Sequence, residues 1–81
     1  LSHFRHTEAL KKYQEWENLQ KQADYDTQLL STLRQSYGEA DEEVREQLAP
    51  SIIQLENKQS LSLQRCQNLL QEIRQIEMSA R

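Results

Sequence analysis

The sequence predicts an all-α fold, an antiparallel two-helix hairpin of the coiled-coil type. One glycine and one proline among 81 residues leave little room for loops. Apolar residues recur at alternating steps of three and four in both halves of the chain, the 3.5-residue period that keeps one narrow face of a helix against another. Gly38 and the acidic residues after it indicate a helix end followed by a helix start.

The first arm of the hairpin is expected from about residue 7 to residue 36. Its apolar residues recur every seven positions, with further leucines between them. Lys12 and Asp26 fall in the same row. The lysine can extend its ammonium group away from an apolar contact, whereas the aspartate is the residue least suited to one. The residues expected to hold this arm to the other, here called the seam, are Ala9, Trp16, Leu19, Ala23 and Leu30.

The turn is expected at about residues 37–41. Gly38 can adopt the left-handed conformation at which helices commonly end, and Asp41 or Glu39 lies nearest to the cap of the next helix. A turn centred near Glu39 would place Leu19 opposite Gln59 and Asp26 opposite Ile52. The predicted hairpin therefore has a defined register as well as a defined topology.

The second arm is expected from about residue 41 to residue 80, with a kink or a break at Pro50. Proline removes a backbone hydrogen bond and clashes with the preceding turn, so residues 41–49 could also form a separate short helix. The apolar period keeps its phase from Leu48 to Ile52, which favours one continuous, bent arm. The seam residues expected here are Leu48, Ile52, Leu55, Ser62, Cys66, Leu69, Ile73 and Ile76.

Further apolar residues beside the seam predict association with another helical surface. Two helices alone would leave them exposed, and contiguous exposed apolar side chains usually mark an interface. The doublets Ile52-Ile53 and Leu69-Leu70 widen the apolar face toward that of a four-helix bundle. The residues expected to bind a partner are Leu10, Leu29, Ile53, Leu61, Leu63 and Leu70.

The charge distribution predicts how two copies would pair. The formal net charge of −3 divides into +1 for residues 1–23, −6 for residues 24–57 and +2 for residues 58–81. Two hairpins packed head to tail would bring opposite signs together, which favours orientation more than affinity. We therefore expect a protein–protein interaction and oligomerisation module, a coiled-coil scaffold that forms an antiparallel homodimer.

The alternative is a monomeric docking module that binds a helical segment of a different protein. A Gln-rich, seam-forming hairpin resembles in outline the stalk proteins of bacterial secretion and the helical effector hairpins that bind small GTPases. This resemblance implies a trafficking or secretion partner, or a small GTPase.

Several classes of function find no support in the sequence. No phosphate-binding loop and no nucleophile with a neighbouring base is present, so we expect no enzyme, no catalytic residue and no cofactor. One cysteine and two histidines predict no metal site and an intracellular, cytoplasmic location. A mean hydropathy of −0.96 argues against membrane insertion, and the acidic balance argues against nucleic-acid binding. The chain begins without methionine, so we expect a single module, residues 1–81, of a larger protein.

Overall fold

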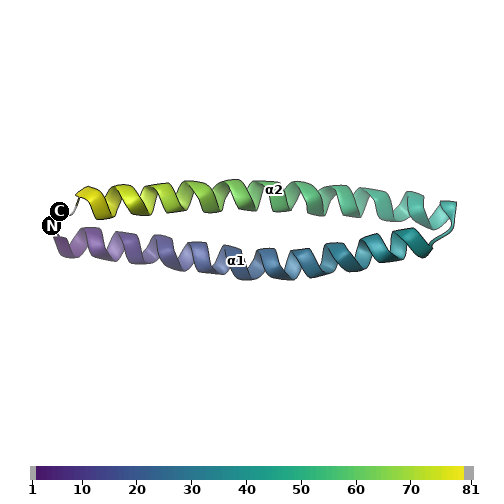
Figure 1. The fold of residues 1–81 in the computed structure, drawn as a ribbon, viewed down its shortest axis with the longest axis horizontal. Coiled ribbons are helices and arrows are strands. Elements are labelled where there is room, and N and C mark those ends of the chain that lie inside the picture. The colour runs from purple at the N-terminus through teal and green to yellow at the C-terminus, as the bar shows by residue number, and fades with distance from the viewer. Residues whose placement is uncertain (1, 80–81) are drawn as a thin grey trace.

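The chain forms a helical hairpin. The computed structural model describes the backbone of residues 2–79 and the side chains of residues 6–79. Helix α1 spans Ser2–Glu39 and helix α2 spans Glu42–Ser79, with Ala40 and Asp41 between them. Figure 1 shows the two helices side by side along their length, with both chain ends at the end opposite the turn. The predicted all-helical hairpin is confirmed for the described residues.

The hairpin is a thin rod. Its extents are 60 × 15 × 12 Å, and its radius of gyration is 18.2 Å. A compact domain of this length would have a radius of gyration of about 12 Å. A rod of two helices has only one line of contact to bury, so most side chains are partly or fully exposed. Neither helix, over the described residues, has a stretch apolar enough to cross a membrane.

The end of α1 is closed by an arginine from α2, and the predicted role of Gly38 is wrong. Helix α1 continues through Gly38 to Glu39, and Gly38 has no positive φ angle. Instead, Arg45 Nε donates to the carbonyl oxygen of Tyr37 (3.0 Å), and Arg45 Nη2 donates to that of Gly38 (3.3 Å). The guanidinium also lies 5.4 Å from the centre of the Tyr37 ring. One cation thus satisfies carbonyl groups at the negative end of the helix dipole and stacks on an aromatic ring.

The start of α2 is capped by Asp41, one of the two residues that the sequence predicted nearest to the cap. Asp41 Oδ1 accepts a hydrogen bond from the backbone N–H of Val44 (3.0 Å), the usual geometry of an N-cap. Glu42 and Glu43 lie in the first turn, where the helix dipole favours negative charge. A cap at both sides of a two-residue connection makes this turn short and well defined.

Helix α2 runs through Pro50 without interruption. Residues 42–49 therefore belong to the same helix as the residues that follow, and the alternative of a separate short helix does not describe the structure. The kink at Pro50 stays a prediction. Residue 80, where the second arm was expected to end, lies outside the described residues.

The register of the hairpin differs from the predicted one. Gln59 Nε2 donates to Thr27 Oγ1 (2.8 Å), whereas the prediction placed Gln59 opposite Leu19. Asp26 pairs with Lys58 (3.1 Å) and was expected opposite Ile52. Part of the difference comes from the turn, which lies at residues 40–41, beyond Glu39, and so moves the opposing residue by about three positions.

The predicted seam residues are all buried or half-buried. Ala9, Leu30, Cys66, Leu69 and Ile73 are buried, and Leu69 and Ile73 are the largest fully buried side chains. The other seam residues are half-buried. The half-buried seam residues are Trp16, Leu19, Ala23, Leu48, Ile52, Leu55, Ser62 and Ile76.

Candidate interaction surfaces

The seam divides the surface of the hairpin into two long flanks. On α2, Leu63 and Leu70 each follow a seam residue by one position, whereas Arg65 and Glu72 each precede one. A helix advances about 100° per residue, so these two pairs lie on opposite sides of the seam. We call the side of Arg65 and Glu72 the ionic flank, and the side of Leu63 and Leu70 the apolar flank.

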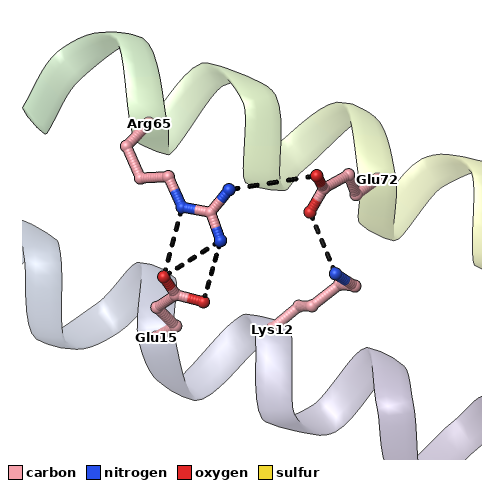
Figure 2. Close-up of polar contacts among 4 residues, drawn as sticks. All are labelled: Lys12, Glu15, Arg65 and Glu72. Atoms are coloured by element: carbon pink, nitrogen blue, oxygen red, sulfur yellow. Dashed lines mark hydrogen bonds and ion pairs between the residues drawn. The ribbon is translucent and has the colours of Figure 1, made fainter. Parts of the chain in front are cut away.

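The ionic flank is held together by alternating charges that link the two helices. Arg65 donates to Glu15 through Nε (3.2 Å) and Nη2 (3.1 Å), and Lys12 Nζ donates to Glu72 (3.0 Å). Arg65 Nη1 also lies 3.9 Å from Glu72, so the four side chains form one connected group (Figure 2). The hydrogen bond from Lys12 is the main cause of a lowered pKa at Glu72; desolvation opposes it, and the charges of Lys12 and Arg65 lower the pKa further.

Lys12 is one of the two charged residues that the sequence places in the seam row, and its charge finds a partner outside the seam. It lies in the row of seam positions and is half-buried, but its ammonium extends to Glu72 on the ionic flank. The apolar part of the side chain can then line the seam while the charge remains near water. Lys12 therefore pairs with the opposite helix in this structure, and the pairing with Glu8 that its spacing also allows is not formed.

Asp26 is the second charged residue in the seam row, and it forms an ion pair with the opposite helix. The residue is 2% exposed, the only polar residue so buried among the described side chains. Lys58 Nζ lies 3.1 Å from Asp26 Oδ2, and Gln22 Nε2 donates to Oδ1 (3.1 Å). A buried carboxylate without such partners would strongly destabilise the fold, so Lys58 and Gln22 are what make this position tolerable.

The apolar flank is lined along α2 by side chains that are half-buried or exposed. Ile53 is 57% exposed and Leu63 is 60% exposed, while Leu70 is half-buried. Leu10 of α1, 50% exposed, lies on the same side as Tyr13, whose hydroxyl donates to Glu77 (3.0 Å) and so has a raised pKa. These side chains run along one side of the rod.

The six predicted partner-binding residues are split between the two flanks. Leu29 borders a shallow groove with Leu55 and Lys58, and Leu61 borders another with Lys58 and Arg65. Both therefore lie on the ionic flank, away from Leu63 and Leu70. Leu10, Ile53, Leu63 and Leu70 share the apolar flank, so the structure divides what the sequence treated as one surface.

Three features of these surfaces escaped the sequence reasoning. The partner of Asp26, the four-residue ionic group and the closing role of Arg45 all depend on which residues the turn brings together. The signal that could have found the ionic group is the seven-residue spacing of Lys58, Arg65 and Glu72 on one side of α2.

No group of three or more His, Cys, Asp or Glu side chains within the described part of the chain could hold a metal ion. The grooves along the rod are shallow and open to solvent. Cys66 is buried and accepts a hydrogen bond from Gln20 Nε2 (3.5 Å), so its thiol is part of the packing.

No protein-family model matches the chain, and the searches of curated proteins and of solved structures found no significant match.

Proposed function

We propose that the chain is a non-enzymatic protein–protein interaction and oligomerisation module, an antiparallel coiled-coil hairpin that pairs with a second copy to form a four-helix bundle. The observation that carries this proposal is the apolar flank. Ile53 and Leu63, both more than half exposed, lie on the same side of α2 as Leu70. Exposed apolar side chains that follow one side of a helix for several turns are typical of an association surface.

The total surface supports the same conclusion. The chain has a solvent-accessible surface of 6546 Å². A compact monomer of the same mass would expose about 5,100 Å². A standard dimer interface removes about 800 Å² from each partner, so pairing would offset more than half of the difference. The hairpin has the excess surface that a four-helix bundle would bury.

Charge supports a head-to-tail arrangement of the two copies. The turn lies within the strongly acidic segment, residues 24–57, whereas the two mildly basic segments meet at the open end of the hairpin. A head-to-tail dimer places each acidic turn beside a basic open end. A head-to-head dimer would place the two acidic turns together, which like-charge repulsion disfavours.

Sedimentation equilibrium of the chain between about 5 and 100 µM tests this proposal, a range in which a micromolar dimer would form. We expect a mass of twice 9.6 kDa at the upper concentrations. A single species of 9.6 kDa throughout would contradict self-association and would favour the docking alternative. In that case Leu63→Glu with Leu70→Glu should leave the mass unchanged while abolishing the capture of a different protein.

A further inference from the structure

We infer that the second copy binds through one specific surface, a row of α2 side chains on the apolar flank, and that the two rows run in opposite directions about a two-fold axis between residues 61 and 62. This inference rests on the proposed function and adds the contact face and its geometry. The row, here called the outer row, lies one position after the seam row of α2 and so has the same alternating steps of three and four. Its small and apolar members are Ala49, Ile53, Ser60, Leu63 and Leu70. Its polar members between them are Gln67 and Glu56, which pairs with Arg34 of α1 (3.7 Å).

The spacing of the outer row is symmetric about the midpoint between residues 61 and 62. A second copy of the row that runs in the opposite direction therefore places its side chains opposite those of the first. Ile53 and Leu70 lie at equal distances from the midpoint, and so do Ser60 and Leu63. Two copies related by the axis would therefore place Ile53 against Leu70, and the small Ser60 against the large Leu63, each contact occurring twice. Large side chains opposite small ones allow a helix interface to fill without voids.

Two charged residues that the hairpin leaves unpaired fit the same arrangement. Glu46 precedes the outer row by one turn, and Arg74 follows it by one turn. Among the described residues, neither has an ion-pair partner within the hairpin. In the reversed pairing, Arg74 of one copy lies against the small Ala49 of the other, one helical turn from Glu46. Glu77, three positions after Arg74, lies against Glu46 in the same pairing, so Arg74 lies one helical turn from two acids, Glu77 of its own copy and Glu46 of the other.

The competing arrangements lose these matches. A parallel pairing of the outer rows would place Arg74 beside Arg74 and Glu46 beside Glu46, which is unfavourable. Pairing through the ionic flank would cover two residues of α2 that are ion-paired with α1, Lys58 and Arg65, whereas the outer row has one, Glu56. On α1, the middle of the apolar flank is polar, with Gln20 and Thr27 bonded across to α2. The outer row of α2 is therefore the part of this surface that a second copy would cover.

A matched pair of substitutions tests the choice of flank. Leu63 and Leu61 are 60% and 67% exposed on the same helix, and they lie on opposite flanks. We expect Leu63→Glu to weaken dimerisation at least tenfold in sedimentation equilibrium, because it buries a charge in the interface. Leu61→Glu should change the dimer affinity less than threefold. Circular dichroism should show that both variants keep their helix content.

Electron paramagnetic resonance with spin labels on Gln64→Cys and on Gln71→Cys tests the direction and the axis. Both variants carry Cys66→Ala to remove the native thiol. In the reversed pairing, the two Gln64 labels are displaced by about 8 Å along the helix axis and the two Gln71 labels by about 29 Å. The Gln71 pair should therefore give the clearly longer interspin distance.

The outcomes separate the two levels of the proposal. A monomer at all concentrations would overturn the proposed function and this inference together. A dimer with equal distances at both labels, or one that Leu61→Glu dissociates and Leu63→Glu leaves intact, would overturn the outer row while self-association stands.

Discussion

The two flanks of the hairpin differ in the side chains that lie beside the seam. On the ionic flank, Lys58 and Arg65 of α2 are bonded to carboxylates of α1. On the apolar flank, Ile53 and Leu63 of the same helix extend into solvent. The difference teaches that the ionic flank is bridged by ion pairs on either side of the exposed Leu61, whereas the apolar flank, bridged at Arg34 and Glu56, has a longer run of apolar side chains that its own chain does not cover. Substitutions that alter the seam, the ionic flank and the apolar flank should therefore have effects of different size.

The largest effect on stability is expected in the seam on which both flanks depend. Leu69 is fully buried, so Leu69→Ala removes packed methyl groups and leaves a cavity. We expect a loss of about 3 kcal/mol in the free energy of unfolding. Leu61→Ala, on the surface of the ionic flank, should change it by less than about 0.5 kcal/mol. Urea unfolding followed by circular dichroism at one fixed protein concentration compares the two, and equal losses would contradict the seam assignment.

The next largest effect is expected where the ionic flank meets the seam. Lys58→Met leaves the buried carboxylate of Asp26 without its cation. Removing one partner of a fully buried pair costs about 3–5 kcal/mol, and because Lys58 is half-exposed we expect about 2 kcal/mol. Adding Asp26→Leu should restore the free energy of unfolding to at least its original value, since an apolar residue then occupies an apolar position. A double variant with a lower free energy of unfolding than the original chain would show that the ion pair itself stabilises the seam.

A smaller effect on stability, on the ionic flank, depends on pH. The pKa of Glu72 is lowered in the folded chain, chiefly by the hydrogen bond from Lys12. Its ionised form therefore stabilises the hairpin above the unfolded pKa of about 4.3, and this contribution is lost as the pH falls through the lowered folded value. The difference in unfolding free energy between the original chain and Glu72→Gln should shrink between pH 6 and pH 2. A difference that stays constant over this range would show that the carboxylate charge contributes nothing.

On the apolar flank the dependence on pH has the opposite sign. The hydrogen bond from Tyr13 to Glu77 raises the pKa of the Tyr13 hydroxyl. The bond is present below the unfolded pKa of about 10 and is lost as the pH rises through the raised folded value. We expect the smallest effect here: a slight loss of helix signal at alkaline pH that Tyr13→Phe abolishes. An identical alkaline transition in Tyr13→Phe would assign it to another group.

The seam could be predicted from the sequence because burial between two helices depends only on the period of the apolar residues. The positions from Ala9 to Leu30 and from Leu48 to Ile76 needed no knowledge of the turn. The register of the hairpin, in contrast, depends on where the turn lies. The side chain of Arg45 donates to the carbonyl oxygens of Tyr37 and Gly38, whereas a left-handed glycine cap would satisfy the last carbonyl groups from the backbone, and α1 continues to Glu39.

The division of the surface into two flanks could be predicted from the sequence, but the hydrogen bonds and ion pairs on them could not. Counting one position before or after each seam residue separates Leu61 from Leu63. The pairing of Lys58 with Asp26 follows from the register and from side-chain reach, which no local pattern encodes. The predicted partner-binding residues are therefore divided between the two flanks, and their binding of a partner stays a prediction.

Isotope-filtered nuclear Overhauser spectroscopy on an equimolar mixture of carbon-13-labelled and unlabelled chains tests most directly whether the apolar flank is completed by a second copy. The account predicts intermolecular cross-peaks between the methyl groups of Ile53 and Leu70, and none from Leu61. Intermolecular cross-peaks from Leu61 without any from Ile53, or none at all at a concentration where the filter is effective, would contradict it.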